Sequence, residues 1–575
     1  MATKKFINEP DDVVDHALHG LVKTNEKLRY HPSCSRVILR TDYKDYLEGG
    51  KVALLAGGGS GHEPFPAGFI GSGLLTGAIC GNVFASPPSQ HVFAALDETR
   101  GKAGTVLFII NYTGDRLNFG FAVEKYKRAG GKARVVVIAD DVAFDTGENR
   151  IGSRGLAGCT LVMKIAGAMA EQGKSMDEIA DFAEKMNAGC ATLGVSLYPC
   201  SLPGRPAMFE LEEGKMEVGL GVHGEPGKKR EDVREVRKLI RQIMDQILQS
   251  KTIGGTEKRL VLLLNNLGAV SQLEMGVLRG EVANYAEAKS LDIALFFHGT
   301  MMTSLDGKGI SLTALRVDDE AVKMLEAETA AEGWTRPHKG FAITTFEQRE
   351  VEDDAGMEGL EKKGAKLNSD ESWLLRNCVE AACQAMLDNR EKLDELDGAA
   401  GDGDCGQTMA QAAKAIQKAA GDLSWEYPST LFSQLALIFQ GSIGGTGGAI
   451  YALLLESASD SFETSAHPRD FGQGLRKGIE TVMKYGRAKP GDRTMVDTLH
   501  AVAEAMSSDF SATKETVSEL CNIANEAAEK TAEMKAHAGR AAYTAEDVQT
   551  KPDAGATAAA IWIEAIGKKF EEKRK

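Results

Sequence analysis

Four short aliphatic runs in the first half of the chain each end directly at glycine, asparagine or aspartate. They are residues 52–56 before GGGSGHEP, 106–110 before NYTGD, 135–139 before DD, and 260–264 before NNLG. Unbroken runs of this length are typical of strands buried on both faces of a sheet. Helical patterns lie between them, at residues 157–171 and 176–186. The alternation predicts βαβ units in an α/β first domain.

The second half of the chain has a different composition. From Trp373 onward Ala, Glu, Lys and Leu recur at helical spacing, as in residues 408–420 and 517–535, without the strand-like runs of the first half. This pattern predicts an all-α domain. The segment between the halves, about residues 345–369, is highly charged and has little apolar periodicity. We interpret it as a mobile interdomain linker, after which Ser369 or Asp370 caps the next helix.

The charge balance and the cysteines limit the classes of partner. Asp and Glu outnumber Lys and Arg by 82 to 67, a formal net charge of −15, which argues against nucleic acid or an anionic membrane as a partner. The nine cysteines include no CxxC pair, and residues 1–10 do not resemble a secretory segment. We therefore expect reduced thiols and a cytosolic protein. The longest apolar runs fall far short of the ~18 residues that span a bilayer.

Two polar turns follow separate strands of the predicted sheet. The run GGGSGHEP brings four glycines and His62 to the end of one strand, and Pro64 can start a helix there. The run NYTGD places Asn111, Thr113 and Asp115 at the end of another. Ligands bind at the carboxyl ends of strands in open α/β sheets, so the turns predict one shared pocket, although packing alone can explain a glycine turn. The spacing matches neither a dinucleotide-binding fingerprint nor a P-loop.

A histidine stands among glycines in the run GLGVHGEPG. His223 is flanked there by small residues, so its ring can be exposed and can act as a base or a nucleophile. The alternative is an ordinary surface histidine in a loop. The other histidines lack such a setting, and His298, in FFHGT, fits a rim or core position.

The strongest signal in the helical half is the run LDGAAGDGDCG. It holds Asp397, Asp402 and Asp404 within eight positions, where the carboxylates repel one another unless a cation neutralises them. Hard oxygen ligands favour Mg²⁺ or Ca²⁺, and the alternative is a solvated acidic turn. The sequence therefore predicts a metal site in this turn.

Two further turns in the helical half suit a nucleotide. The glycine-rich run at residues 441–451 leads into a helix, so its backbone N–H groups can hold phosphate. The run at residues 486–499 has a Pro-Gly-Asp turn followed by a helix start. Arg493, in the second run, suits a phosphate or a carboxylate. Beside the aspartates, these turns favour a Mg-nucleotide site over simple packing features.

Taken together, the motifs resemble the ATP-dependent dihydroxyacetone kinases over essentially the whole chain, and most of all the animal members that join triokinase and FMN cyclase activities. GGGSGHEP, NYTGDRLNFG, LGVHGEPG, NNLG and TMMTSLDGKGISLT resemble the family's K domain, and AAGDGDCGQT, GGTGGAIY, KYGRAKPGDRTMVDTL and KPDAGATAA its L domain. The resemblance implies a multidomain fold, α/β plus all-α. Its parts are a two-lobed α/β domain of the DhaK type at 9–340, a charged linker at 341–369, and a helical barrel of the DhaL type at 370–571 that binds Mg-ATP.

The resemblance also implies roles for individual residues. His223 matches the histidine that binds the substrate carbonyl carbon as a covalent hemiaminal, and His62 and Asp115 would relay or accept the proton of the attacking hydroxyl. The implied sugar contacts are Gly59, Ser60, Gly61, His62, Asn111 and Asp115. The implied ligands of Mg²⁺ are Asp397, Asp402 and Asp404. The implied nucleotide contacts are Asp404, Cys405, Gly406, Gln407, Thr446, Gly447, Gly486, Thr494, Met495, Asp553, Ala554 and Gly555.

The sequence departs from the family pattern at two places. Ile110 stands just before NYTGD, where the family often has lysine, so a sugar contact from that side chain is missing, although a backbone contact can persist. The usual Ser-Ser of the L-domain glycine loop is Thr446-Gly447, which leaves one hydroxyl to reach phosphate. Neither change removes His223 or the aspartates.

The implied reaction is ATP-dependent phosphorylation of dihydroxyacetone and glyceraldehyde by a homodimer, in which the K domain of one chain faces the L domain of the other. One alternative is an additional FAD-AMP lyase activity at the L-domain site, which forms cyclic FMN with Mn²⁺ or Co²⁺. Another is a ketose-sensing regulator without catalysis, against which the three aspartates argue. The fused L domain disfavours a phosphotransferase-system subunit, and GLGVHGEPG disfavours a fatty-acid kinase.

Overall fold

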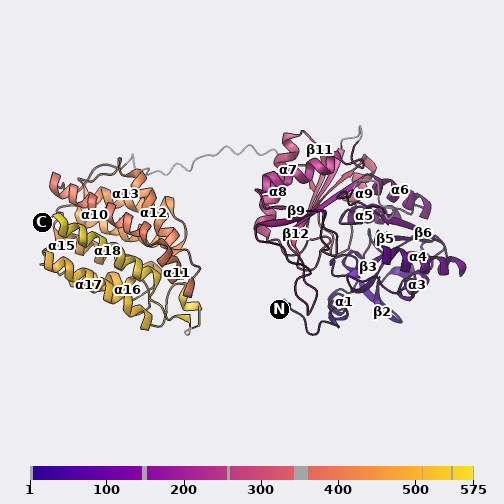
Figure 1. Ribbon diagram of the computed structural model, residues 1–575, viewed down its shortest axis with the longest axis horizontal. Helices are drawn as coiled ribbons and strands as arrows, with labels where there is room; N and C mark the ends of the chain where they lie inside the picture. Colours follow the sequence, from indigo (N-terminus) through magenta and orange to yellow (C-terminus); the bar gives the residue numbers. More distant parts are fainter. Residues whose placement is uncertain are drawn as a thin grey trace. The chain divides into compact units, whose positions relative to one another are not determined.

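The computed structural model describes residues 4–144, 152–254, 259–341, 360–507, 509–545 and 548–573. The chain divides into two compact units, Met1–Thr345 and Phe346–Lys575. The described residues of the first unit form an α/β structure, and those of the second form helices without strands (Figure 1). The predicted fold class is confirmed. The predicted linker falls for its greater part outside the described residues.

The first lobe of the α/β unit is built on a six-stranded sheet of order β1-β2-β4-β3-β5-β6. Strand β3 runs parallel to β4 and β5, and β5 runs parallel to β6. The carboxyl ends of β3 and β5 therefore meet at one edge. The strands are β1 (Leu28–His31), β2 (Cys34–Arg40), β3 (Ala53–Ser60), β4 (Gly77–Val83), β5 (Thr105–Ile110) and β6 (Ala133–Ile138). The first helices of the unit are α1 (Val13–Thr24), α2 (Tyr43–Glu48), α3 (Ser89–Glu98) and α4 (Thr113–Arg128).

The second lobe contains a mixed seven-stranded sheet of order β13-β11-β10-β12-β7-β8-β9. Its strands are β7 (Cys190–Tyr198), β8 (Lys215–Val218), β9 (Lys229–Asp232), β10 (Arg259–Asn266), β11 (Asp292–Gly299), β12 (Lys308–Arg316) and β13 (His338–Lys339). The remaining helices of the unit are α5 (Gly158–Glu171), α6 (Met176–Ala188), α7 (Val236–Gln249), α8 (Gln272–Ala288) and α9 (Asp319–Glu326).

Helix α5 joins the two lobes into one core. It contacts β3 of the first sheet and both β7 and β12 of the second, and nearly all of its residues are buried. Its side chains share one apolar cluster with Leu54 and Phe108 of the first sheet and with Leu263 and Phe297 of the second. A helix that is apolar all round is stable only when it is covered on every side. The lobes are therefore held in a defined relation by a common core.

The second unit is a closed ring of helices. Contacts run from α10 through α12, α13, α14, α15, α16 and α17 to α18, which packs back against α10. The ring encloses an apolar cavity of about 610 Å³. The helices are α10 (Ser369–Asp388), α11 (Arg390–Ala400), α12 (Cys405–Ala419), α13 (Pro428–Ser442), α14 (Gly445–Ser459), α15 (Pro468–Gly486), α16 (Met495–Ala505), α17 (Lys514–Lys530) and α18 (Ala554–Lys573).

Two local predictions are wrong by small margins. Asn368, rather than Ser369 or Asp370, caps α10: its side chain accepts hydrogen bonds from the backbone N–H groups of Asp370 and Glu371. Asparagine outcompetes serine here because Glu371 completes a capping box with it. Pro64 does not start an α-helix, since only a short 3₁₀ turn, η1 (Ala67–Phe69), follows it.

No helix of the described ranges is both long and apolar enough to cross a membrane.

Candidate active site

The glycine turn after β3 brings the backbone against neighbouring segments. A Cβ atom at Gly59 would lie 2.7 Å from the backbone nitrogen of Ala85. Gly61 has a φ of +102°, and a Cβ there would lie 2.7 Å from the ring of Phe84. Ser60 donates its hydroxyl to the carbonyl oxygen of Gly81, 2.8 Å away. These residues are thus required for close packing, whatever else they contact.

His62 is buried at the end of this turn with a defined tautomer. Its Nδ1 lies 2.9 Å from the carbonyl oxygen of Thr303. A carbonyl only accepts, so Nδ1 carries the proton and Nε2 is an acceptor. This Nε2 is buried without a hydrogen-bond partner in the part of the chain that the structure describes. Burial lowers the pKa of His62 to about 3, so the ring stays neutral.

His223 comes from the loop after β8, in the other lobe, and meets His62. The two rings are edge to face, with centroids 5.1 Å apart. The ring of Tyr112 lies 4.6 Å from His223 and that of Phe84 lies 5.2 Å from it. Burial lowers the pKa of His223, which keeps a neutral, nucleophilic imidazole. The fold therefore joins the two histidines that the sequence singled out.

Asp115 and Asn111 lie where β5 passes into α4. Asp115 is buried, and its Oδ1 has no hydrogen-bond partner among the described residues. A Cβ at Gly58 would lie 4.0 Å from its Oδ2, so the carboxylate faces the glycine turn. Burial raises the pKa of Asp115 to about 6, against the opposing effect of the nearby Ser86 hydroxyl. The Asn111 side chain donates to the carbonyl oxygen of Ser153 at 2.6 Å. The two strand-end turns thus meet at one place.

Ile110 is not part of the pocket surface. Its side chain is 3% exposed and belongs to the core between the sheets. Parallel strands of this kind are apolar on both faces, so the side chain of Ile110 serves packing.

The sequence analysis missed three residues around His223. Tyr112, Arg154 and Glu225 form a polar group beside the ring: Arg154 Nη1 lies 3.3 Å from Glu225 Oε1, and the Tyr112 hydroxyl lies 3.5 Å from the same oxygen. Tyr112 belongs to NYTGD and Glu225 to HGEPG. The presence of Tyr112 and Glu225 inside these two motifs is the sequence signal that could have identified them.

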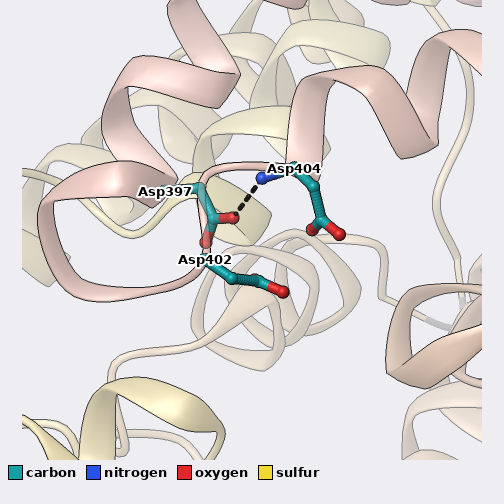
Figure 2. A group of neighbouring side chains, drawn as sticks. All are labelled: Asp397, Asp402 and Asp404. Carbon is teal, nitrogen blue, oxygen red and sulfur yellow. Dashed lines mark hydrogen bonds between the residues drawn. The ribbon is translucent and has the colours of Figure 1, made fainter. Parts of the chain in front are cut away.

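The second unit gathers the three predicted metal ligands. Asp397 lies in the last turn of α11, Asp402 in the following loop, and Asp404 directly before α12 (Figure 2). One carboxylate oxygen from each lies within 4.8 Å of the others. Asp397 Oδ2 accepts a hydrogen bond from the backbone N–H of Asp404, 2.9 Å away. Three convergent carboxylates fit the oxygen-rich coordination of Mg²⁺. Asp402 also forms an ion pair with Arg540.

The predicted nucleotide contacts stand at helix ends around this cluster. Helices α12, α14, α16 and α18 begin at residues 405, 445, 495 and 554, and α15 ends at Gly486. A Cβ at Gly447 would lie 3.6 Å from Thr408, and one at Gly555 would lie 3.5 Å from Met495. The first turn of α14 therefore lies close to α12, and the first turn of α18 lies close to α16. Helix N-termini favour phosphate because their N–H groups are unpaired and the helix dipole is positive there.

Two residues beside these helix ends have structural partners. Asp553 is half-buried next to α18, and burial raises its pKa to about 6, with the nearby charge of Asp397 acting in the same direction. Its Oδ1 accepts from the backbone N–H of Ala556 at 2.8 Å. Arg493 is buried and donates to the backbone oxygen of Lys551 at 2.7 Å. The guanidinium therefore holds the segment that leads to Asp553.

Comparisons with known proteins extend over both units. The Dak1 domain family matches residues 19–333, and the DAK2 domain family matches residues 399–568. The triokinase/FMN cyclase of Mus musculus is 38% identical over 587 residues, and the match covers 98% of this chain and 98% of that protein.

Two solved structures are similar in different ways. The dihydroxyacetone kinase from C. freundii in complex with AMP-PNP and Mg²⁺ has a TM-score of 0.66 and 30% identity, covering 99% of this chain and 100% of that one. A co-activator of a dihydroxyacetone kinase operon has a TM-score of 0.53 and 30% identity, and covers only 58% of this chain but 100% of its own. The co-activator thus has no counterpart for the rest of this chain.

Proposed function

Because the chain belongs to the dihydroxyacetone kinase family and is therefore a kinase, we propose that it phosphorylates dihydroxyacetone and glyceraldehyde with ATP. The observation that carries this proposal is a pair of buried acceptors. His62 Nε2 and Asp115 Oδ1 have no hydrogen-bond partner within the described ranges. Buried acceptors are costly unless a donor reaches them, and a short hydroxylated carbonyl compound supplies hydroxyl donors to both.

In this proposal, the first unit binds the triose covalently. The neutral ring of His223 adds to the carbonyl carbon and forms a hemiaminal, which selects aldoses and ketoses against polyols that lack a carbonyl. His62 Nε2 accepts a hydrogen bond from a substrate hydroxyl, and the Asp115 carboxylate removes the proton of the hydroxyl that attacks ATP. The turn residues Gly59, Ser60, Gly61 and Asn111 shape the pocket around the sugar.

The second unit would hold the nucleotide. Asp397, Asp402 and Asp404 hold Mg²⁺, which neutralises phosphate charge when it is bound. The helix ends position the phosphates through backbone N–H groups. The residues proposed to contact the nucleotide are Asp404, Cys405, Gly406, Gln407, Thr446, Gly447, Gly486, Thr494, Met495, Asp553, Ala554 and Gly555.

A coupled assay tests the proposal directly. The full chain is incubated with dihydroxyacetone, Mg²⁺ and ATP, and triose phosphate is measured with an excess of a reporter dehydrogenase. We expect ATP-dependent product, and none with glycerol in place of the ketose. A chain that binds the ketose but forms no product would instead be a sensor.

The pH dependence of the reaction reports the proposed base. Burial raises the pKa of Asp115 to about 6, so the carboxylate is ionised above that pH and protonated below it. We expect kcat/KM to be level near pH 8 and to fall about tenfold per unit below pH 6, because only the ionised form accepts the proton. In the Asp115→Asn variant, the residual kcat/KM should no longer fall as the pH decreases below 6.

Asp553 needs a control in that experiment, because burial also raises its pKa to about 6. Binding of Mg-ATP, measured by calorimetry over the same pH range, separates the two groups. If binding alone accounts for the loss of rate at low pH, the assignment of this loss to Asp115 is wrong.

We propose FMN cyclase activity as a second function of the same nucleotide site. The match to triokinase/FMN cyclase extends over 98% of both chains, and a nucleotide site that holds ATP can also hold the ADP-like half of FAD. Incubation with FAD and Mn²⁺ or Co²⁺ should then release AMP and cyclic FMN. His223 has no part in this reaction.

We also propose that the enzyme acts as a homodimer in which the first unit of one chain faces the second unit of the other. The test mixes two inactive chains, His223→Ala and Asp402→Asn, under conditions that let subunits exchange. Pairing between chains restores one intact site in each mixed dimer, so activity should return to about a quarter of the wild-type value after random exchange. Pairing within one chain leaves the mixture inactive.

A further inference from the structure

Glu225 directly follows a tight turn that contains His223. The turn closes with a hydrogen bond from the backbone N–H of Gly224 to the carbonyl oxygen of Gly221, 3.1 Å away. The Glu225 side chain folds back over Gly221, where a Cβ atom would collide with its carboxylate. Gly221 therefore leaves the space that the carboxylate occupies.

Two groups hold one oxygen of this carboxylate and leave the other available. Oε1 lies 3.3 Å from Arg154 Nη1 and 3.5 Å from the Tyr112 hydroxyl. Oε2 is buried and has no hydrogen-bond partner among the residues described. Arg154 is already shared, since it also pairs with Asp141 at 2.7 Å and donates to the carbonyl oxygen of Gly219 at 2.7 Å. The negative charge of Glu225 is therefore only partly compensated.

Tyr112 connects this carboxylate to the histidine ring. Its hydroxyl accepts from the backbone N–H of Val222 at 3.1 Å, which fixes the phenol next to the turn. Its ring then contacts His223 edge to face, with centroids 4.6 Å apart. The charge of Glu225 raises the pKa of His223 and so favours its cationic form, against burial and the charge of Arg154, which both lower that pKa. Tyr112 thus contacts both Glu225 and His223.

The addition of His223 to a carbonyl group creates a positive charge at this place. The lone pair of one ring nitrogen forms the new C–N bond, and the π electrons of the carbonyl move onto its oxygen. The ring still carries a proton on its other nitrogen and becomes an imidazolium, while the oxygen becomes an alkoxide. The alkoxide takes up a proton from the solvent while the ring keeps its own proton, so the adduct carries the imidazolium charge. A buried cation is costly unless an anion lies close to it.

We propose that Glu225 is a positioning residue for this step: its carboxylate stabilises the imidazolium formed as His223 adds to the carbonyl carbon, and Tyr112 and Arg154 hold it in place. This inference rests on the proposed function, because it assigns a role in the formation of the hemiaminal. It adds a residue of the first unit that acts through His223.

The experiment measures the adduct itself, without ATP. The full chain is titrated with dihydroxyacetone labelled with ¹³C at the carbonyl carbon, and the protein-bound signal of the tetrahedral carbon is followed by NMR. The His223→Ala variant identifies which bound signal is the adduct. We expect Glu225→Gln to lower the adduct equilibrium constant about tenfold or more. Glu225→Asp should restore part of the loss, and Tyr112→Phe should lower the constant by a smaller factor.

The outcomes separate the inference from the proposed function. If the wild-type protein forms no adduct, the hemiaminal mechanism fails, and the inference fails with it. If the wild-type adduct is lost in His223→Ala but keeps its equilibrium constant in Glu225→Gln, only the inference is overturned. Glu212→Gln, a change at an exposed position of the same unit, serves as the matched control.

Folding is checked by thermal unfolding and by binding of Mg-ATP, both of which should be the same in the variants as in the wild type. If Glu225→Gln does not fold, Tyr112→Phe decides the matter, because it removes only the hydroxyl that contacts Glu225. An unchanged adduct constant in Tyr112→Phe then overturns the inference.

Discussion

The Asp402→Asn variant should lose phosphorylation of dihydroxyacetone by about 10²- to 10³-fold, because charge neutralisation dominates catalysis of phosphoryl transfer. Asp402 is one of three carboxylates whose oxygens lie within 4.8 Å of one another. An amide at this position keeps the size of the side chain but removes one negative charge from the cluster. The remaining pair should hold Mg²⁺ more weakly, and the affinity for Mg-ATP should fall with it.

Two measurements separate this effect from damage to the fold. Mg²⁺ with ATP should raise the unfolding temperature of the second unit in the wild-type chain, and this increase should be reduced in Asp402→Asn. Asp460→Asn is the matched control, since Asp460 pairs with Lys477 on the surface of the same unit at 2.6 Å. A wild-type rate and an unchanged Mg-ATP affinity in Asp402→Asn would show that the three aspartates do not form the metal site.

The His223→Ala variant should lose triose phosphorylation by on the order of 10³-fold or more, because the substrate is no longer held covalently in the reactive position. Its affinity for Mg-ATP should stay the same, since the nucleotide groups belong to the second unit. Cleavage of FAD to AMP and cyclic FMN, if the wild type carries it out, should continue at the wild-type rate. The measurement is a pair of assays on the same preparation.

The control for this variant is His19→Ala, because His19 is an exposed histidine on α1 of the same unit. It should keep both activities. Loss of both activities in His223→Ala would contradict the division of labour between the two units. Retention of triose phosphorylation would contradict the covalent role of His223.

The candidate site residues of the two units differ in how far the sequence predicts them. Asp397, Asp402 and Asp404 lie within eight positions, so a single bend of the chain brings their carboxylates together (Figure 2). The short distances between these carboxylates depend only on local geometry. The sequence alone is therefore enough to identify the cluster. The helix ends that surround it carry glycine turns that are also visible in the sequence.

The first unit is different, because its site joins distant parts of the chain. His62 follows β3 of one sheet and His223 follows β8 of the other, and α5 packs between the lobes. No spacing in the sequence encodes that meeting. The same holds for the tautomer of His62, which depends on the carbonyl oxygen of Thr303 from a third segment.

The sequence also does not predict in which direction a side chain points from its strand. Ile110 was interpreted as a missing sugar contact, and its side chain lies in the core. Both faces of β5 are buried, so the pattern of apolar residues carries no signal for which face a given residue occupies. Glu225 was overlooked for a related reason, since its importance comes from Tyr112 and Arg154 beside it.

The sequence by itself determined the elements of this protein, its division into an α/β and a helical unit, and the acidic turn. These follow from local backbone preferences and from the periodicity of burial, which act over a few residues. The tertiary structure alone decided which strand ends share an edge, which acceptors are left without partners, and what charge surrounds His223. Those properties depend on contacts between residues far apart in the chain and on the exclusion of water, and both arise only when the core is packed.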